Sequence, residues 1–323
     1  MKTNFTEICI TVDGGTTNTR LSLVRNGEII DTLKYGVGAC LGCSDKEPIY
    51  RSLRNGIDEL CKRNSINESD ISCVIASGMI TSEGGLYNLP HLIAPVTIND
   101  LASSIYKTKF SEITDIPFYL IRGVKTAYKA DLSLDMMRGE ETELFGLSEQ
   151  IEPDSIYLLP GSHTKIIYVD SDSCISGIHT SLSGEMMNAV LNDTILKNSI
   201  SFDTRGSLSH KYLISGYNFA KNHGVSAAFF KVRVIDKQIS AASNECFSFF
   251  LGAALQGDVD NVITSTASRV IIGGKRELRE PLSVLIRSLS SMSVIEVDDS
   301  ACACASVIGA MRIYRASLGH SLS

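Results

Sequence analysis

The sequence predicts an α/β protein made of two similar lobes. Near the N-terminus, apolar residues alternate in two runs, Ile8 to Val12 and Arg20 to Val24. This period-two pattern is typical of half-buried strands, and a glycine-containing polar turn joins them. The same order of strand, polar turn and strand returns in YLLPGSHTKIIYV, residues 157–169. Because internal repetition indicates repeated structure, we expect one lobe over residues 1–150 and a second over 151–323.

Length and charge restrict the classes of protein to which the chain can belong. Its 323 residues can bury two ordinary cores, and its net charge of −6 argues against a nucleic-acid partner. No apolar run approaches the ~20 residues that span a bilayer. The first residues also lack the apolar segment of a secretory signal, so we expect a cytoplasmic protein with no membrane partner. A homodimer is compatible with the sequence, which does not fix the oligomeric state.

Nine cysteines are scattered through apolar strings, which is typical of reduced, buried thiols rather than a disulfide framework. Cys40 and Cys43 form a single CxxC. A tetrahedral zinc site needs four ligands, and neither a second CxxC nor paired histidines accompany these two. We therefore expect no zinc or redox role there.

The first polar turn contains the residue types that bind phosphate. Glycines leave backbone N–H groups uncovered, and the short side chains after them add hydroxyl and amide donors. Asp13, at the end of the buried strand, can hold Mg²⁺ through water. The proposed phosphate ligands are Gly15, Thr16, Thr17 and Asn18. The alternative is an ordinary hairpin whose turn is simply polar.

The second polar turn offers a similar set, Gly161, Ser162, Thr164 and Lys165, with the lysine adding a fixed positive charge. A third glycine-containing feature follows the strand Val270 to Ile272. There Gly273 and Gly274 make a strand-to-helix junction where a flat adenine ring can approach the backbone. Two lobes facing one another would present both turns to a shared cleft.

Helical spacing predicts helices over residues 48–63, from Glu140, over 182–196, through Cys246 to Ala254, and near the C-terminus. In the helix at 182–196, Leu182, Met186 and Val190 align, with Met187 beside them, and we expect both methionines to fill core. Residues 78–101 form a loop too long for a simple connection. Its apolar content predicts an ordered wall or lid of a site.

Several of these stretches together resemble a known family, the 2-dehydro-3-deoxygalactonokinases of the actin/hexokinase/Hsp70 ATPase superfamily. The resemblance rests on VDGGTTNTR (12–20), GMITSEGGLYNLPHL (78–92), MRGEETELFG (137–146), LPGSHTK (159–165), LSGEMMNAVL (182–191) and Gly273–Gly274, in the family's order. One departure is Gly14, where the family is expected to carry a tryptophan. The resemblance implies two ribonuclease-H-like lobes of the actin-like ATPase fold with an interlobe cleft, and a last helix that packs back on the first lobe.

The implied reaction is phosphorylation of the C6 hydroxyl of 2-dehydro-3-deoxy-D-galactonate, in galactonate catabolism, with ATP and Mg²⁺ as cofactors. Glu141, followed by Thr142, resembles the acidic residue that the superfamily's sugar kinases place at a loop-to-helix junction, and it is our preferred base. Glu140 and Glu185 are the alternatives. All three also fit simple helix N-terminal chemistry, because carboxylates there suit the macrodipole.

A carboxylate substrate also calls for an arginine, because its guanidinium can donate two parallel hydrogen bonds. Arg138 is the preferred residue over Arg20 and Arg122. Ser82 and Glu83, in the long loop, are expected to bind substrate hydroxyls. Two alternatives to this reading stay open: a kinase for another sugar or sugar acid, and an ATP-driven clamp or sensor that phosphorylates no small molecule.

Overall fold

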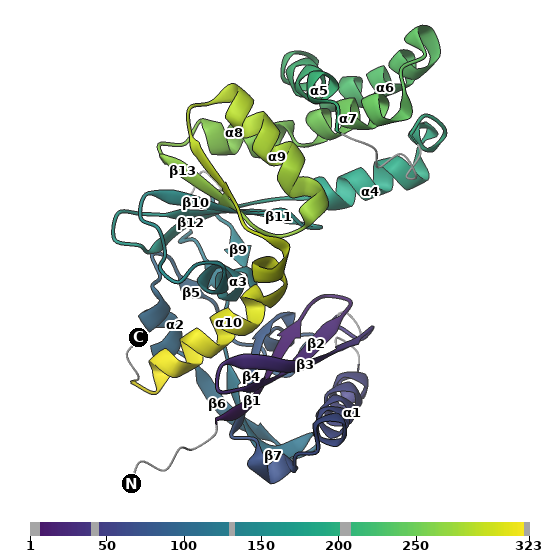
Figure 1. The fold of residues 1–323 in the computed structure, drawn as a ribbon. Coiled ribbons are helices and arrows are strands. Elements are labelled where there is room, and N and C mark those ends of the chain that lie inside the picture. The colour runs from purple at the N-terminus through teal and green to yellow at the C-terminus, as the bar shows by residue number, and fades with distance from the viewer. Residues whose placement is uncertain (1–6, 40–44, 129–132, 201–207, 320–323) are drawn as a thin grey trace. The chain divides into compact units, whose positions relative to one another are not determined.

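The structure is a computed structural model that describes residues 7–39, 45–128, 133–200 and 208–319. Cys40 and Cys43 lie outside these residues. The chain forms two compact units: unit 1 contains residues 1–152, 172–178 and 300–323, and unit 2 contains 153–171 and 179–299 (Figure 1). The division into lobes 1–150 and 151–323 stays a proposal. The observed units differ from it because residues 172–178 and 300–323 group with unit 1.

Unit 1 is built on a six-stranded sheet of order β3-β2-β1-β4-β7-β6. The predicted hairpin is confirmed as β1 (Ile8–Gly14) and β2 (Thr19–Arg25), followed by β3 (Glu28–Tyr35). β1 pairs antiparallel with β2 and parallel with β4 (Cys73–Gly78), and β4 pairs parallel with β7 (Thr114–Leu120). β6 (Tyr106–Phe110) is the antiparallel edge. The parallel strands β1 and β4 therefore end side by side at Gly14 and Gly78.

The alternation of β1 gives the sheet two covered faces. Ile8, Ile10 and Val12 join the core beneath helix α1 (Glu47–Asn64). The residues between them point to the opposite face, because successive strand side chains alternate. On that side Tyr314, from helix α10 (Asp299–Ser317), stacks edge-on against Tyr119 of β7 with ring centroids 4.8 Å apart. Asp13 belongs to this second set, so core packing on one face fixes its direction.

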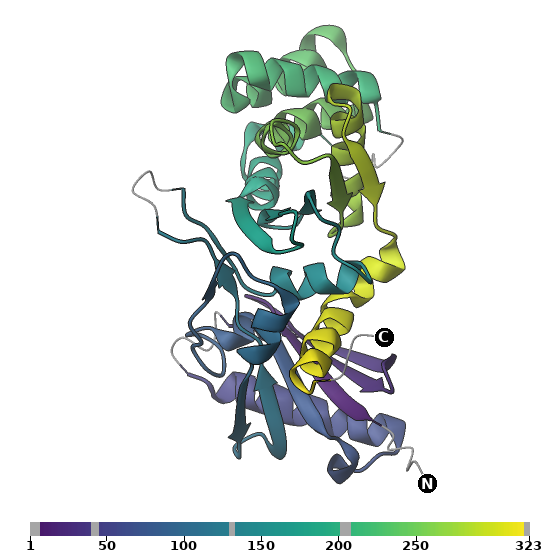
Figure 2. The ribbon, with the colours of Figure 1, turned by 90° about the vertical axis from the view of Figure 1, so that its left-hand side faces the viewer.

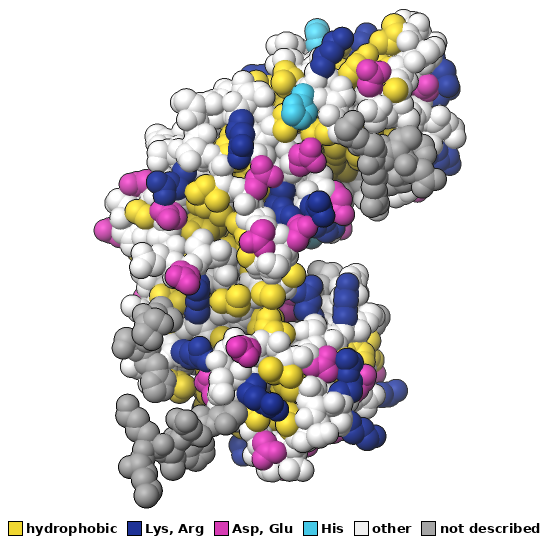
Figure 3. Space-filling view, viewed as in Figure 1, with side chains coloured by type: hydrophobic (Ala, Val, Ile, Leu, Met, Phe, Trp, Pro, Cys, Tyr) yellow, Lys and Arg dark blue, Asp and Glu magenta, His cyan; other side chains and the backbone are white. Residues whose placement is uncertain are grey.

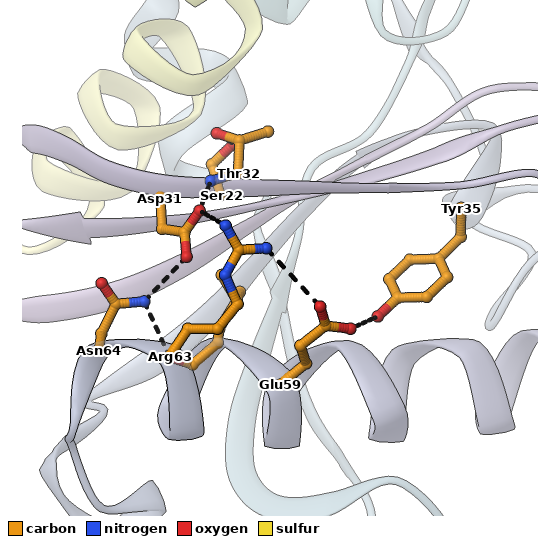
Figure 4. Close-up of polar contacts among 8 residues, drawn as sticks. Ser22, Asp31, Thr32, Tyr35, Glu59, Arg63 and Asn64 are labelled. Carbon is orange, nitrogen blue, oxygen red and sulfur yellow. Dashed lines mark hydrogen bonds and ion pairs between the residues drawn. The ribbon is translucent and has the colours of Figure 1, made fainter.

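Polar contacts tie the last turns of α1 to the edge strand β3 (Figure 4). The Arg63 guanidinium lies 3.0 Å from Asp31 and 3.6 Å from Glu59, and the Tyr35 hydroxyl donates to Glu59 at 3.0 Å. Burial, and then the hydrogen bond to Glu59, raise the pKa of Tyr35 to about 12. Asn64 donates to Asp31 as well. Arg63 and Glu59 are half exposed, so we attribute the stability of α1 mainly to its apolar face.

Two glycines bring α10 against helix α3 (Glu140–Leu147), and the two helices lie side by side in both views (Figures 1 and 2). A Cβ on Gly146 would lie 1.8 Å from the Ala305 carbonyl oxygen, and one on Gly309 would lie 1.8 Å from that of Thr142. Arg312 donates to the Phe145 carbonyl at 2.8 Å. The crossing leaves no room for a side chain at either glycine. It also accompanies a hydrogen bond between Ser306 of α10 and Asp13 of β1.

The long loop predicted over 78–101 is ordered. It contains the 3₁₀ turn η2 (Met79–Thr81), strand β5 (Leu92–Ile93) and helix α2 (Ile98–Ser103). β5 joins a small sheet with β8 (Val124–Lys125) and β9 (Met136–Met137), in the order β5-β8-β9. This sheet leads directly into Arg138 and α3. A further 3₁₀ turn, η1 (Glu68–Asp70), precedes β4.

Unit 2 repeats the pairing of unit 1 in a five-stranded sheet of order β12-β11-β10-β13-β14. β10 (Ser155–Leu159) pairs antiparallel with β11 (Thr164–Val169) and parallel with β13 (Arg269–Ile272), as β1 pairs with β2 and β4. β12 (Ile175–Ser181), whose residues up to Ile178 group with unit 1, and β14 (Ser293–Glu296) form the edges. The quasi-repeat predicted from the two polar turns is therefore visible in the strand pairing.

The helices of unit 2 enclose its own apolar core. They are α4 (Ser183–Asp193), η3 (Ile195–Asn198), α5 (His210–His223), α6 (Val225–Ile239), α7 (Ser243–Ala254), α8 (Gln256–Ile263) and α9 (Arg276–Leu289). α4 corrects one expectation: Met187 is buried, whereas Met186 is 37% and Leu182 59% exposed. The helix buries only a narrow stripe, because just one side of it meets the core.

On the face drawn in Figure 3, acidic and basic side chains are interspersed rather than gathered in one basic stripe. None of the seven cysteines within the described ranges forms a disulfide. The predicted burial holds for Cys9, Cys73 and Cys246, whereas Cys61, Cys174, Cys302 and Cys304 are half-buried. Among the described residues, no helix is both long and apolar enough to cross a membrane.

Candidate functional site

The backbone of the first polar turn is fixed by neighbouring residues, while its side chains are exposed. Gly15 donates to the Asn18 carbonyl at 2.7 Å and accepts from Ala39 at 3.1 Å. Gly38 lies directly beneath, because a Cβ there would come within 2.5 Å of the Thr16 backbone. Thr16, Thr17 and Asn18 are exposed, and Asn18 donates to the Thr17 hydroxyl at 2.9 Å. The turn is thus a rigid backbone that presents hydroxyl and amide groups to an incoming ligand.

Asp13 stands at the end of β1, beside this turn. Burial raises its pKa, while the Arg20 charge and a hydrogen bond from Ser306 of α10 oppose that rise. Gly14 packs on Ile80, since a Cβ there would lie 2.6 Å from the Ile80 Cβ. A tryptophan, expected at this position in the family, would require Ile80 and η2 to move. In this chain Ile80 belongs to the apolar core of unit 1 and fills the space beside Gly14.

Two glycines with positive φ bring α3 to the same place. Gly78 has φ +79° and Gly139 has φ +111°, and a Cβ on Gly139 would lie 3.1 Å from the Gly78 Cα. Few other residues adopt such angles without strain. A Cβ on Gly78 would in turn lie 3.5 Å from the Asp13 carboxylate. The structure therefore brings Asp13 and the N-terminus of α3 together around Gly78.

Glu141, the preferred base, is 0% exposed in the first turn of α3. Both its carboxylate oxygens accept from the Gly139 N–H at 2.9 Å, and Oε1 also accepts from the Thr142 hydroxyl at 3.2 Å. Burial, followed by the charge of Glu140, raises the pKa of Glu141 to about 7. A carboxyl group with this pKa can exchange a proton near neutral pH.

Glu140 and Glu143 complete an acidic group on α3. Glu140 is half-buried and accepts from the Arg138 backbone N–H at 2.9 Å. Burial, followed by the charges of Glu140 and Asp13, raises the pKa of Glu143 to about 7, against the opposing charge of Arg20. Sequence reasoning missed Glu143. Its position three residues after Glu140, on the same helical face, was the signal that could have found it.

Arg138 holds the loop that precedes β5. Its Nη1 donates to the carbonyl and the hydroxyl of Thr81, both at 2.7 Å, and its Nη2 donates to the Leu89 carbonyl at 2.8 Å. The ring nitrogens of His91 lie 3.2 Å from Nη2. Burial, followed by the charges of Arg138 and Lys125, lowers the pKa of His91 to about 4. The guanidinium thus faces a neutral imidazole near neutral pH.

Arg122 supports the same loop, donating to the Pro90 carbonyl at 3.1 Å. Within the described residues, neither Arg122 nor Arg138 forms an ion pair with a carboxylate. Ser82 donates to the Met79 carbonyl at 2.7 Å, and Glu83 next to it is exposed. The loop thus carries Ser82 and Glu83 on a backbone anchored by two arginines.

In unit 2 the second polar turn is held by the start of α4. Glu185 N–H donates to the Ser162 carbonyl at 2.9 Å, and a Cβ on Gly184 would lie 1.9 Å from the Gly161 carbonyl oxygen. Ser162 is exposed, whereas Thr164 and Lys165 are buried. The Lys165 ammonium donates to the Thr180 hydroxyl at 2.8 Å.

The Gly273–Gly274 junction adjoins the second turn. Gly273 N–H donates to the Leu158 carbonyl, and Lys275 N–H donates to that of Pro160, both at 3.0 Å. Gly274 has φ +67°, and a Cβ there would lie 2.5 Å from the Pro160 carbonyl oxygen. Glu185, exposed at the start of α4, lies 3.5 Å from His163. The predicted residues of unit 2 therefore form one group around Pro160.

The predicted residues thus form two sets, one within each unit. Asp13, the first turn, Arg138, Ser82, Glu83 and the α3 glutamates belong to unit 1, and the remainder belong to unit 2. Their union in one nucleotide site stays a prediction. In the part of the chain that the structure describes, no three His, Cys, Asp or Glu side chains are grouped to bind a metal directly. Asp13 alone still fits Mg²⁺, which usually keeps several waters and takes one or two carboxylates plus phosphate oxygens.

Comparison with known proteins adds relatives by sequence. The chain is 25% identical over 187 residues to the 2-dehydro-3-deoxygalactonokinase of Escherichia coli (strain K12), which covers 58% of each chain. It is 32% identical over 68 residues to the probable 2-dehydro-3-deoxygalactonokinase DgoK1 of Rhizobium meliloti (strain 1021), covering 21% of this chain and 22% of the relative. The chain therefore spans less than two thirds of the length of these curated relatives.

Solved structures show the fold. A putative 2-dehydro-3-deoxygalactonokinase from Sinorhizobium meliloti matches with a TM-score of 0.76 at 17% identity, over 95% of this chain and 98% of the other. The (R)-2-hydroxyglutaryl-CoA dehydratase component A of Acidaminococcus fermentans matches with a TM-score of 0.51 at 11% identity, over 97% and 99%. The predicted α/β class with the actin-like ATPase fold is confirmed.

The family model described as 2-keto-3-deoxy-galactonokinase matches residues 13–308. This range begins at Asp13 and includes both polar turns, the start of α3 and the Gly273–Gly274 junction. The chain therefore belongs to the 2-keto-3-deoxy-galactonokinase family.

Proposed function

We propose that this protein is an ATP-dependent kinase that phosphorylates the C6 hydroxyl of 2-dehydro-3-deoxy-D-galactonate. The observation that carries the proposal is the meeting of the phosphate-type turn and Asp13 with a buried glutamate whose pKa is about 7. Membership of the 2-keto-3-deoxy-galactonokinase family supports the acceptor. The relatives that match by sequence are described as kinases for this compound.

The nucleotide would be held by both polar turns. Thr16, Thr17 and Asn18 would contact the β- and γ-phosphates through their exposed hydroxyl and amide groups, above a backbone fixed by Gly38 and Ala39. Gly15, whose N–H donates to the Asn18 carbonyl, would hold the turn in the shape that receives them. Gly161, Ser162, Thr164 and Lys165 would contact phosphate from unit 2, with Lys165 acting from its buried place beside Thr180. Gly273 and Gly274 would border the adenosine. Mg²⁺, held through water by Asp13, would neutralise phosphate charge.

The chemical step needs a proton acceptor for the sugar hydroxyl, a poor nucleophile. The hydroxyl oxygen forms a bond to the γ-phosphorus, the bond from that phosphorus to the β-phosphate bridging oxygen breaks, and the hydroxyl proton passes to Glu141. Glu141 suits this role because its pKa of about 7 is matched to neutral pH. Glu140 is the alternative base, since it is half-buried one residue earlier. Glu185 is a second alternative in unit 2.

The acceptor carboxylate would lie near Arg138, whose charge lacks a carboxylate partner among the described residues. Its two η-nitrogens already donate to Thr81 and Leu89. A two-pronged hydrogen bond to the substrate would therefore require one of these to be released. We accordingly assign to Arg138 a positive field at the acceptor and the anchoring of the loop that carries Ser82 and Glu83. Those two side chains would bind acceptor hydroxyls.

A coupled assay of ADP release tests the proposal, with 2-dehydro-3-deoxy-D-galactonate, its 2-dehydro-3-deoxygluconate epimer and plain hexoses as acceptors. We expect turnover that depends on ATP, Mg²⁺ and the galactonate compound, and a product phosphorylated at C6. Preference for the epimer or for a hexose would move the protein to another acceptor. ATP hydrolysis that ignores every acceptor would favour the clamp or sensor.

A further inference from the structure

A buried carboxylate in unit 2 has no part in the roles assigned above. Asp258 lies in the first turn of α8 and is only 2% exposed. Its Oδ2 atom is buried without a hydrogen-bond partner among the described residues. A buried polar oxygen left unpaired costs about 1–3 kcal/mol, and more when it is charged. A residue retained at this cost is expected to contribute to binding or to the shape of a site.

Three hydroxyl groups face this carboxyl group. Ser181 donates to the Ser183 hydroxyl at 3.1 Å, and the Ser183 and Thr164 hydroxyl oxygens are 2.7 Å apart. Burial raises the pKa of Asp258, while the nearby hydroxyl groups of Ser181 and Ser183, the charge of His179 and the Thr164 hydroxyl oppose the rise. The oxygens of a carboxyl group accept hydrogen bonds, so Asp258 orders the hydroxyl groups that point toward it.

The hydroxyl chain ends on the second polar turn. Thr164 is the last residue of that turn and the first of β11, and Ser183 is the first residue of α4. The next two residues of α4 hold the turn by its backbone, through Gly184 against Gly161 and Glu185 against Ser162. Ser183 therefore connects Asp258 to both the side-chain and the backbone supports of the turn.

We propose that Asp258 is a positioning residue for the second turn, fixing the Thr164 side chain and the start of α4 through the Ser183 hydroxyl. The turn then presents its N–H and hydroxyl groups to nucleotide phosphate without first having to be ordered. Pre-ordering of this kind strengthens binding because the cost of immobilising the site is already met. This inference rests on the proposed nucleotide role of the turn.

The experiment compares nucleotide affinity by calorimetric titration with ADP and with a non-hydrolysable ATP analogue. The variants are Asp258→Asn, Ser183→Ala and the double variant. We expect each single change to weaken binding about tenfold, the equivalent of one hydrogen bond to a charged group. The double variant should bind no more than about twofold weaker than the weaker single, because neighbours in one network are not additive.

Asp260→Asn is the matched control. Asp260 lies two residues along the same helix and pairs with Lys221 at 3.1 Å. Its replacement should lower the melting temperature without changing nucleotide affinity. If Asp258→Asn does not fold, a double-mutant cycle of Ser183→Ala and Thr164→Val replaces it. The effects of these two changes on nucleotide affinity should again be non-additive.

Wild-type affinity in folded Asp258→Asn, or additive effects in either cycle, would overturn the positioning role. A wild-type protein that binds no nucleotide would instead refute the proposed function, so the two failures are distinguishable.

Discussion

The two polar turns occupy equivalent places in their sheets but are surrounded by different chemistry. In unit 1 the turn follows a carboxylate, Asp13, and adjoins an acidic helix start. In unit 2 the turn follows Pro160, and its Thr164 hydroxyl contacts the Ser183 hydroxyl, which lies near Asp258. The first turn is supported by the backbone of Gly38 and Ala39, the second by the start of a helix. The proposed function accordingly assigns proton transfer to one unit and phosphate binding to both, on the same strand pairing.

The largest expected effect separates two glutamates at comparable helix starts. Glu141→Gln should lower the turnover number by about 10²–10⁴-fold, because the base is lost while the turn is intact. Glu185→Gln, at the start of α4, should leave turnover within about threefold, since its side chain is 62% exposed and paired with His163. Wild-type turnover should rise with pH through about 7, as Glu141 loses its proton.

Steady-state kinetics between pH 5.5 and 9 measures both effects. An unaffected Glu141→Gln enzyme would remove Glu141 from the role of base. A severe defect in Glu185→Gln would move proton transfer to unit 2.

The second comparison sets a crowded helix glycine in unit 1 against an uncrowded one in unit 2. Gly309→Ala should destabilise the protein by about 1–3 kcal/mol, because its Cβ would meet the Thr142 carbonyl at 1.8 Å. Gly257→Ala, with no atom within 4 Å of the added Cβ, should be neutral or stabilising by about 0.5–1 kcal/mol. Chemical denaturation of both variants measures the difference. Equal effects would show that the crossing of α3 and α10 tolerates a methyl group.

The third comparison concerns the carboxylate that only the first turn possesses. Asp13→Asn should raise the Mg²⁺ concentration needed for half-maximal rate about 10–100-fold, as expected when a group holding a metal through water is lost. Thr164→Val, in the second turn, should weaken nucleotide binding without a comparable change in Mg²⁺ requirement. Magnesium titrations at saturating acceptor distinguish them. An unchanged requirement in Asp13→Asn would assign the metal elsewhere.

The smallest expected effect concerns the loop of unit 1 that Arg138 anchors. Arg138→Lys keeps the charge but loses the planar fork that donates to Thr81 and Leu89. We expect the KM for the acceptor to rise about tenfold, with the KM for ATP nearly constant. Arg63→Lys, at the end of α1, is the matched control and should alter neither KM. A rise confined to ATP would place Arg138 on the nucleotide side.

Sequence periodicity predicted the local elements well where one face is buried. The opening hairpin, α1 and the strand-turn-strand at Tyr157 were all predicted from alternation or helical spacing. It did worse on α4, where Met186 is exposed although it is as apolar as its buried neighbour Met187. Spacing identifies an apolar stripe, but how wide a stripe is covered depends on the neighbouring elements.

The site could be predicted only as far as residue type and local order allow. Asp13 was proposed from its place near the end of a buried strand and Glu141 from the family resemblance, and both roles stay predictions. Glu143 and Asp258 were missed, because their importance arises from neighbours distant in sequence, such as Asp13 or Ser183. Nor could the sequence reveal that Arg138 uses both its η-nitrogens inside the protein.

The alternation of β1 has a consequence for how this chain can vary. Ile10 and Val12 face the helix α1 core, whereas Asp13 faces the other way. Inserting a single residue into this strand would exchange the two faces and direct the carboxylate into hydrocarbon. Insertions and deletions should therefore be tolerated near the turn but not within the strand. The number of residues from Ile8 to Asp13 should accordingly vary less than the identity of any single residue between them.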